Sequence, residues 1–547
     1  MSDPIQADAP LQQGLAHRTI ALEDENADAH FNRANALFDL HRYEDAIASY
    51  DNAIAREPAH MPAWKNRGLA LIRLARYEQA AASCARALVL APEDAEARAF
   101  RGNALQGLGR FQEAVESLDR ALALQPRYAE AHHARGLALS ALQERAEAVA
   151  SFDRAIAIDP DFAAALFHRG NVLMELDRWE DARLSYDRAV QADSRFAAAY
   201  VNRGTALTFL GQLEDAIASY SHALALTDDL PVAHFGRAVA RLLAGRLEEA
   251  WVDHEWRWKA LRIGTALAAG QDSRPLWVGE QSLSGRTILL YSEQGLGDTI
   301  QLCRYASLVA ERGAKVYLQV QDPLVGLLTG LAGVSAVFPA QLAPPAFDYR
   351  CPLMSLPLAF KTTLATIPSS PQYLTSDPAK VARWRAALGG SKRALRVGLA
   401  WSGSAAHPRN QSRSIALATL MRYLPAKPQY VTLQTEVRPE DRQTLRSHPA
   451  LLDVSGELQD FSDTAALCEC LDLVVSVDTC TVHLGAALGK PTWVLLPFAP
   501  DWRWMLHRAD SPWYPSVTLY RQQMPGDWES VLVRVAEALM RFVPRNP

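Results

Sequence analysis

The chain has 547 residues, of which 49% are hydrophobic and 21% are charged, and its formal net charge is −5. One hydrophobic core rarely extends over such a length, so we expect two to four domains. The slightly acidic balance argues against a nucleic-acid-binding protein, which needs a basic surface, although it leaves room for a local basic groove. No stretch reaches the roughly 20 apolar residues of a membrane span.

Two further features of composition bear on location and metals. The first residues, MSDPIQADAP, lack the basic and apolar regions of a secretory signal, so we expect a cytoplasmic protein. The six cysteines have neither the C-x-x-C spacing nor the histidine partners of a zinc site. We therefore expect reduced thiols and no bound metal.

The first half of the sequence repeats with a period of 34 residues. Arginine recurs at this spacing, at Arg33, Arg67, Arg101, Arg135, Arg169, Arg203 and Arg237. Alanine follows the same spacing, at Ala46, Ala80, Ala114, Ala148, Ala182, Ala216 and Ala250. Proline closes the early units, at Pro58, Pro92, Pro126 and Pro160. A small residue lets two helices approach closely and a proline stops the second, so each unit is expected to be a helix pair.

This pattern resembles the tetratricopeptide repeat (TPR). It predicts an α-solenoid of about seven repeats over residues 27–264, preceded by a capping helix or tail at 1–26. Such arrays present a concave face to peptide segments, so we expect a protein partner there. Asn35, Asn103 and Asn171 are candidates to bind a partner's backbone, with solvated polar positions as the alternative. For the arginine series, ion pairing inside the array is favoured over ligand binding.

The second half changes pattern after a linker at 265–283. Apolar strands alternate with helical stretches, first RTILLY and AKVYLQV and then LRVGLAW, QYVTLQ, LDLVVSV and PTWVLLPF. We expect two Rossmann-like units, at 284–388 and 389–547, with a break near Ser391–Arg393. The predicted fold class is thus α + α/β.

Polar or glycine-rich residues follow each of these strands. They are SEQGLGD with Gly295, Gly297 and Asp298; Trp401, Ser402 and Gly403; Gln434 to Glu436; and Asp478 to His483. Ligands of open parallel sheets bind beyond the carboxyl ends of the strands, so these four segments are expected to meet in one crevice.

The segments GLGDTIQLCRYASLVAERGA, RVGLAWSG and SVDTCTVHLGAALGKPTWVLL resemble the GT-B glycosyltransferases related to bacterial heptosyltransferases (glycosyltransferase family 9-like), particularly their TPR-fused members. The runs RSI, DWRW and SPWYP extend the resemblance to roughly 277–528. It implies an acceptor-side unit at 284–388 and a nucleotide-sugar-binding unit at 389–547. It also aligns Asp298 with the base that deprotonates the acceptor and Arg413 with a residue that contacts the donor's phosphates.

The same residues suggest how a diphosphate is held. Thr479, Cys480 and Thr481 begin a helix whose free N–H groups suit phosphate, and His483 can donate to a phosphate oxygen. Asp478 is expected to orient the loop or a ribose hydroxyl, and Gln434 or Glu436 to lie near the nucleotide. The alternatives are structural: strand–helix packing for the helix, a simple N-cap for Asp298, and core packing for Trp401, Trp502 and Trp504.

The sequence therefore predicts a metal-independent, inverting glycosyltransferase with a nucleotide-sugar donor and no cofactor. The array favours a polypeptide acceptor, and TPR-fused transferases of this kind include enzymes that modify serine or threonine hydroxyls, flagellin among their acceptors. Two alternatives stay open: a TPR scaffold whose transferase-like half is inactive or only binds nucleotide, and a transferase for a glycan or lipid acceptor.

Overall fold

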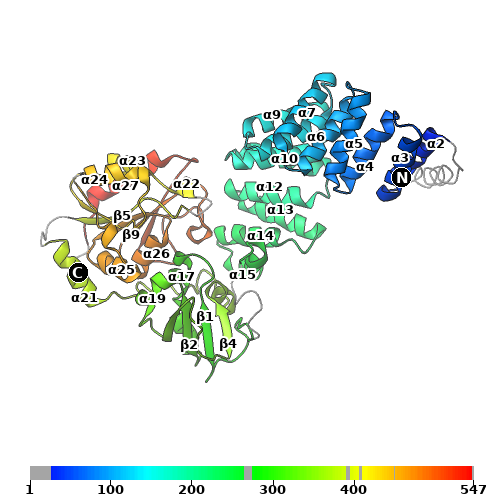
Figure 1. Cartoon of the computed structure of the whole chain (residues 1–547). Helices are drawn as coiled ribbons and strands as arrows, with labels where there is room; N and C mark the ends of the chain where they lie inside the picture. Colours follow the sequence, from blue (N-terminus) through cyan, green and yellow to red (C-terminus); the bar gives the residue numbers. More distant parts are fainter. Residues whose placement is uncertain (1–25, 264–273, 390–394, 406–409, 449, 545–547) are drawn as a thin grey trace. The chain divides into compact units, whose positions relative to one another are not determined.

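The computed structural model describes residues 26–263, 274–389, 395–405, 410–448 and 450–544 (Figure 1). The chain divides into two compact units, Met1–Ala206 and Leu207–Pro547. The predicted capping segment before residue 26 and the predicted break at Ser391–Arg393 lie outside the described residues. The division after Ala206 falls inside the predicted array, because the last repeats pack with the α/β half.

The first unit is a stack of helix pairs. Its helices are α2 (Ala27–Asp39), α3 (Tyr43–Arg56), α4 (Met61–Arg73), α5 (Tyr77–Leu90), α6 (Ala95–Gly107), α7 (Phe111–Leu124), α8 (Ala129–Ala141), α9 (Arg145–Ile158), α10 (Ala163–Glu175), α11 (Trp179–Ala192) and α12 (Ala197–Phe209). Each of Pro58, Pro92, Pro126 and Pro160 lies just beyond the end of the second helix of a pair, where its missing N–H stops the helix.

The small residues explain how closely the helices of a pair approach. All seven alanines of the 34-residue series are fully buried, with 0% exposure. A Cβ on Gly136 would lie 2.6 Å from the ring of Phe152, so only glycine fits between these two helices. Tyr50, Phe152, Tyr186 and Tyr220 are buried. The predicted helical solenoid is confirmed.

The second unit begins with the remaining helices of the array. These are α13 (Leu213–Leu226), α14 (Pro231–Leu243), α15 (Leu247–His254) and the short α16 (Arg257–Ala260). Helix α15 is tied to the α/β part by the Trp251 indole, whose Nε1 donates to the Thr362 carbonyl at 2.7 Å. The apolar side chains Leu243, Leu247 and Trp251 belong to the same core as the first sheet.

The first sheet is parallel and has the order β3-β2-β1-β4. Its strands are β1 (Thr287–Tyr291), β2 (Lys315–Val320), β3 (Val334–Pro339) and β4 (Tyr349–Pro352). The associated helices are α17 (Leu296–Leu302), α18 (Tyr305–Glu311), α19 (Asp322–Leu328), η1 (Leu353–Ser355), α20 (Leu356–Ala359) and α21 (Pro378–Ala387).

The second sheet is also parallel and has the order β10-β9-β8-β5-β6-β7. Its strands are β5 (Arg396–Ala400), β6 (Gln429–Thr432), β7 (Leu451–Leu452), β8 (Leu473–Val477), β9 (Thr492–Leu496) and β10 (Val517–Arg521). The associated helices are α22 (Asn410–Arg413), α23 (Leu417–Tyr423), η2 (Pro439–Asp441), α24 (Arg442–Ser447), η3 (Ser455–Glu457), α25 (Phe461–Glu469), α26 (Cys480–Ala487), η4 (Trp502–Trp504) and α27 (Trp528–Arg541).

Counted from β5, this order is the 3-2-1-4-5-6 arrangement of doubly wound sheets. The strands β8 and β9 are wholly buried, which is why their sequences are nearly continuous apolar runs rather than alternating ones. The predicted parallel α/β units are therefore present.

Helix α21 (Pro378–Ala387) lies just before the predicted boundary between the two units, at 388/389. The sequence places it with the first sheet, but it packs against α25 of the second. Arg383 pairs with Asp463 at 2.6 Å, and the Asp463 side chain is only 1% exposed. Because a carboxylate this deeply buried needs a cation, the ion pair fixes α21 to the second sheet.

Candidate functional site

The site is built where each sheet reverses its strand order. In the second sheet the reversal falls between β5 and β8, which pair directly. In the first it falls between β1 and β4. Loops leave the carboxyl ends of such strands in opposite directions and open a crevice between them. The segments after β5, β8 and β1 are those that carry the predicted polar residues.

These segments line one cavity of about 520 Å³. The structure brings together residues from the loop after β1, from the loop after β5, from α22 and from the start of α26. The predicted residues among them are Gly295, Gly297, Asp298, Gly403, Arg413, Asp478, Thr479, Cys480 and His483.

Helices α17 and α26 lie side by side (Figure 1), and Gly297 is at the start of α17. A Cβ at this position would lie 2.8 Å from His483 Cδ2 and 3.5 Å from the Cys480 Cα. Any side chain here would therefore push the two helix starts apart and change the shape of the cavity.

The His483 imidazole is neutral, so one of its ring nitrogens can donate a hydrogen bond and the other can accept one. Its Nδ1 lies 2.8 Å from the Tyr514 hydroxyl, and its ring stacks on Trp504 at 5.4 Å between centroids. Burial, together with the nearby Arg503 charge, lowers the pKa of His483 to about 3. When the Tyr514 hydroxyl donates to Nδ1, the imidazole hydrogen sits on Nε2, on the side of Gly297.

Arg413 supplies positive charge to the same cavity. Its Nη1 donates to the Asp478 carbonyl at 3.0 Å, which fixes the guanidinium beside the start of α26. The buried Arg413 Nε has no hydrogen-bond partner among the described residues. Gly403 makes room for the group, because a Cβ there would lie 2.3 Å from Arg413 Nη2. A guanidinium with an unused donor beside a helix start suits an anionic ligand.

Asp298 is held on both of its oxygens. Oδ2 accepts from the Gly295 N–H at 2.7 Å. Gly295, not Asp298, is the N-cap of α17, and Asp298 is the third helical residue, reaching back to it. Oδ1 contacts Arg503 Nη2. Arg503 also donates to Asp501 Oδ1 at 2.7 Å and to Gln301 Oε1 at 2.5 Å. The carboxylate thus faces the cavity as part of a charged network.

The remaining groups at the start of α26 are neutral or weakly acidic. Burial and the neighbouring Asp501 raise the pKa of Asp478. Burial also raises the pKa of the Cys480 thiol to about 11, so it stays protonated near neutral pH. With a pKa of about 6, Asp478 is mostly ionised at neutral pH, and its repulsion toward an anion falls only below that pH.

Five predicted donor residues are not among the described residues that line this cavity: Trp401, Ser402, Gln434, Glu436 and Thr481. Trp401 is buried in the core of the second sheet, where its Nε1 donates to Asp441 at 2.9 Å. Gln434 Oε1 accepts from the Trp401 and Ser402 N–H groups at 3.3 and 3.2 Å, so it closes the end of β5. Glu436 is exposed and Thr481 is buried within α26.

Sequence reasoning missed the charged pair Asp501 and Arg503, which line the cavity. The run DWRW, just beyond β9, was singled out for its tryptophans rather than for these residues. Of those tryptophans, Trp504 is fully buried and stacks on His483. The sequence signal that could have pointed to Arg503 is an arginine that lies between two tryptophans, shortly after a buried strand.

In the array, the periodic arginines have internal partners. Arg67, Arg135 and Arg169 each bind an aspartate of the preceding helix at 2.6 Å and a serine of the following helix. Arg203 and Arg237 pair with Asp187 and Asp253. The predicted ion pairing inside the array is therefore present for these five residues.

Two of the predicted groove asparagines form a repeated contact. Asn35 Oδ1 accepts from Tyr50 Oη at 2.7 Å and from Asn66 Nδ2 at 3.0 Å. Asn171 Oδ1 accepts from Tyr186 and Asn202 in the same way, both at 2.8 Å. Asn103 is half-buried. Asn66 and Asn202 were not predicted, although each precedes an arginine of the series.

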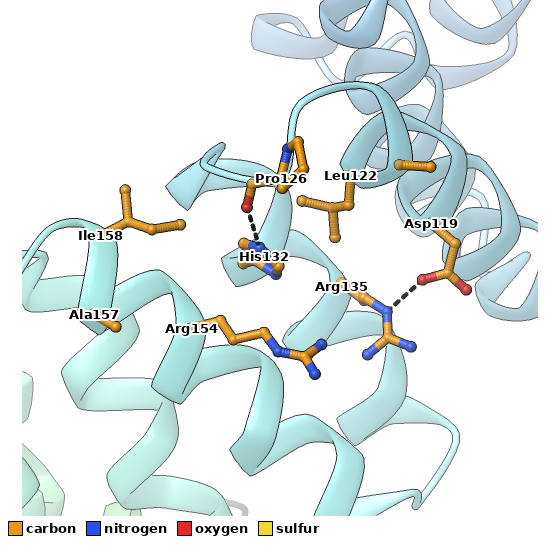
Figure 2. A pocket seen from close by; sticks show the side chains of 9 residues that line it. Asp119, Leu122, Pro126, His132, Arg135, Arg154, Ala157 and Ile158 are labelled. Atoms are coloured by element: carbon orange, nitrogen blue, oxygen red, sulfur yellow. Dashed lines mark hydrogen bonds and ion pairs between the residues drawn. The ribbon is translucent and has the colours of Figure 1, made fainter.

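The array also has a cavity of about 510 Å³ beside α7, α8 and α9. Figure 2 shows Arg135 bound to Asp119 and His132 bound to the Pro126 carbonyl at its wall. Leu122 and Ile158 supply apolar surface. Because these polar groups bind within the array, they mainly join neighbouring repeats.

Candidate membrane-spanning helices and metal sites are both absent from the described part of the chain. No helix there combines the length and apolar character needed to cross a membrane. Within the same residues, no group of three or more histidine, cysteine, aspartate or glutamate side chains is arranged to hold a metal ion. The six cysteines are free thiols.

Comparison with known proteins identifies the repeats. A tetratricopeptide repeat model matches residues 31–95, 133–195, 167–231 and 201–254, and a second TPR model matches 102–143. The helical array is therefore built of tetratricopeptide repeats.

Among curated proteins, the chain is similar to Protein FlbA of Caulobacter vibrioides (strain ATCC 19089 / CIP 103742 / CB 15). The two are 29% identical over 294 residues, which cover 49% of this chain. The match spans about half of that relative, 48% of its length.

Solved structures give further likenesses. The chain is similar to the Cut9–Hcn1 hetero-tetramer of the APC/C, with 15% identity, a TM-score of 0.39 and coverage of 42% of this chain and 46% of the other. It is also similar to Pseudomonas aeruginosa PilF, with 16% identity, a TM-score of 0.36 and coverage of 39% and 96%.

Proposed function

We propose that the chain is a GT-B glycosyltransferase that moves a sugar from a nucleotide-sugar donor to a polypeptide hydroxyl. The observation that carries the proposal is a cavity of about 520 Å³ at the switch points of two Rossmann-like sheets. Loops from both sheets, the start of α26 and Arg413 line it. A site between two such sheets suits a donor held by one and an acceptor approached from the other.

The donor's diphosphate is proposed to lie at the start of α26. Negative charge grows on the leaving diphosphate as the glycosidic bond breaks, so fixed donors that already point at it lower the barrier. The N–H groups at Cys480 and Thr481, the Arg413 guanidinium and the neutral His483 imidazole are the groups proposed to fill this role, without a metal ion. Arginine adds a planar fork that binds two phosphate oxygens at once.

Asp298 is proposed to take the acceptor's proton. The hydroxyl oxygen attacks the anomeric carbon, its hydrogen passes to the carboxylate, and the nucleoside diphosphate leaves with the bonding electron pair. In the structure Arg503 occupies one carboxylate oxygen, so the acceptor hydroxyl must compete with this guanidinium. The TPR array is proposed to recruit the polypeptide, since stacked helix pairs offer an extended binding surface.

The Asp298–Arg503 contact favours one other candidate: a TPR interaction protein whose α/β half binds nucleotide without turnover. In that case Asp298 only binds the N–H of the N-cap residue Gly295 and pairs with Arg503. The two candidates share the phosphate site and differ in chemistry alone.

The phosphate site is tested by thermal shift with UDP, GDP, ADP and CMP. We expect one nucleotide to stabilise the wild type, by about 2.7 kcal/mol at 100 times its dissociation constant. Arg413→Met and Gly297→Ala should each reduce that affinity by about 10- to 100-fold, the range for a lost charge-assisted hydrogen bond. Gly456→Ala is the control, because a Cβ there meets nothing within 4 Å.

The chemistry is tested with the sugar derivative of the nucleotide that binds. With a serine-containing peptide as acceptor, mass spectrometry should show the sugar on the peptide and free nucleotide for the wild type and not for Asp298→Asn, with nucleotide binding retained in both. Binding without turnover in the wild type would favour the interaction protein. If none of the nucleotides stabilises the wild type, the phosphate site is wrong and both candidates fail.

A further inference from the structure

A second cavity adjoins the phosphate site. It encloses about 370 Å³ and shares Gln294, Arg413, Asp478, Asp501 and Arg503 with the first cavity, so the two are neighbours. Its other wall includes residues of the last repeat, contributed by α14 and the end of α15. We call this second cavity the acceptor cavity. Its lining includes six residues that do not line the first cavity: Phe235, Val239, His254, Leu261, Met354 and Trp502.

The polarity of the acceptor cavity is divided between its two walls. The charged groups lie on the shared wall and are engaged there: Arg503 with Asp501, and Arg413 with the Asp478 carbonyl. The repeat side presents Phe235, Val239 and Leu261. A ligand that spans both walls must therefore be polar at the phosphate site and apolar toward the repeat.

His254 is the exception on the apolar wall. It is 1% exposed, and its Nδ1 has no hydrogen-bond partner among the described residues. Its ring lies edge-on to Trp251 and Trp502, with centroids at 5.9 and 6.1 Å. A buried ring nitrogen without a partner is unfavourable, so a ligand that brings a hydrogen-bond partner to it is favoured.

We propose that the acceptor cavity binds the polypeptide next to the modified hydroxyl, with an apolar or aromatic side chain against Phe235 and Val239 and a backbone amide bonded to His254. This proposal rests on the proposed function. A sugar acceptor is disfavoured, because its many hydroxyls would meet an apolar wall with one polar group. A peptide offers both a large apolar side chain and a regularly placed amide.

The test uses full-length protein and two fluorescein-labelled pentapeptides. Both have a central serine between glycine ends; one has phenylalanine on each side of the serine and the other has aspartate. Anisotropy should show at least 10-fold tighter binding of the phenylalanine peptide. Val239→Trp, which fills the cavity, should weaken that binding at least 10-fold, and Phe235→Ala should weaken it less.

Val252→Trp is the matched control. Val252 lies on α15, is 66% exposed and does not line the cavity, so peptide binding should stay as in the wild type. The nucleotide thermal shifts should be the same in every variant, and circular dichroism melting identifies any variant that does not fold. Phe235→Ala removes atoms rather than adding them, so it keeps the test valid if Val239→Trp misfolds.

The outcomes separate the two proposals. Equal binding of both peptides, or peptide binding that Val239→Trp and Phe235→Ala leave unchanged, would overturn the acceptor cavity. Loss of peptide binding in these variants with intact nucleotide shifts supports it. Peptide binding that depends on Val239 in a protein that binds no nucleotide would keep the cavity as a peptide site and overturn the glycosyltransferase.

Discussion

The repeat array and the α/β half use polar residues in opposite ways. In the array, polar side chains recur with the helix pairs and bind each other, as Arg135 binds Asp119 and Ser151. In the α/β half they follow no period, and Arg413 Nε lies buried beside the cavity without a partner among the described residues. In the array, the buried nitrogens Arg98 Nε, His132 Nδ1 and His133 Nε2 also have no partner among these residues, and they lie outside the periodic arginine series. A periodic polar residue is therefore a guide to packing, whereas an isolated one after a buried strand is a guide to a ligand.

The comparison extends to energetics. The ion pairs of the arginine series are partly exposed: the Arg135 and Asp119 side chains are 20% and 51% exposed. The pair between Arg257 and Glu293 is buried, at 0% and 1%. Water weakens the first kind and not the second, so loss of one partner should have very different effects.

The largest expected effect is that of breaking the buried pair. Burial raises the pKa of Glu293 to about 8 even beside Arg257, so a charge is stranded only at high pH. Above about pH 8, Arg257→Met leaves an ionised Glu293 without its cation, and the free energy of unfolding should fall by about 3–5 kcal/mol. Urea denaturation followed by circular dichroism measures this. The double variant Arg257→Met/Glu293→Gln should recover part of the loss, because the stranded charge is removed. A single variant as stable as the wild type would show that the pair is not needed.

An intermediate effect is expected from pH. The pKa of His483 is lowered to about 3 by burial, whereas an unfolded histidine titrates near 6.5. The unfolded chain therefore binds more protons between these values, and stability should fall as pH drops from about 6.5 toward 3. His483→Gln should reduce this slope by about 1.4 kcal/mol per pH unit.

The array provides the matched histidine. Burial lowers the pKa of His133 to about 4, where its ring lies against Phe152 and Phe162. His133→Gln should reduce the same slope over a narrower window, from about 6.5 to 4, and leave nucleotide binding unchanged. If neither substitution changed the pH dependence of the free energy of unfolding, burial would not be what keeps these two histidines from taking up a proton.

The smallest effect is expected in the arginine series. Arg135→Met removes a half-exposed ion pair and should lower the free energy of unfolding by about 1 kcal/mol or less. Urea denaturation is again the measurement, with the nucleotide thermal shift as a second readout that should not move. If the loss of stability were as large as that of Arg257→Met, the array would need its arginine series as much as the α/β half needs the Arg257–Glu293 pair.

The sequence predicted best where a pattern repeats. The 34-residue spacing of alanine and proline specified the helix pairs, because close packing and helix termination each need one residue type. Apolar runs such as LDLVVSV specified buried parallel strands. The convergence of the loops with Asp298, Gly403, Arg413 and Asp478 followed from the rule that strand ends meet at one edge.

Side-chain direction was the part that could not be predicted. Trp401 follows a strand, as the cavity residues do, yet it turns into the core toward Asp441. Gln434 closes a strand end instead of facing the cavity. Arg503 reaches Asp298 across 205 positions of sequence. Such contacts depend on how two sheets pack, and no local pattern records that.

The Trp251–Thr362 hydrogen bond has a consequence for how this protein can be divided or recombined. It joins the last repeats to the two sheets in one compact unit, so the boundary between the two units lies within the array rather than after it. A fragment beginning at residue 265 would uncover the apolar face that Trp251 and Leu247 now cover. In a chimera of two related proteins, the α/β half should keep its packing only if the junction lies near residue 206. The last repeats and the sheets then come from the same parent protein.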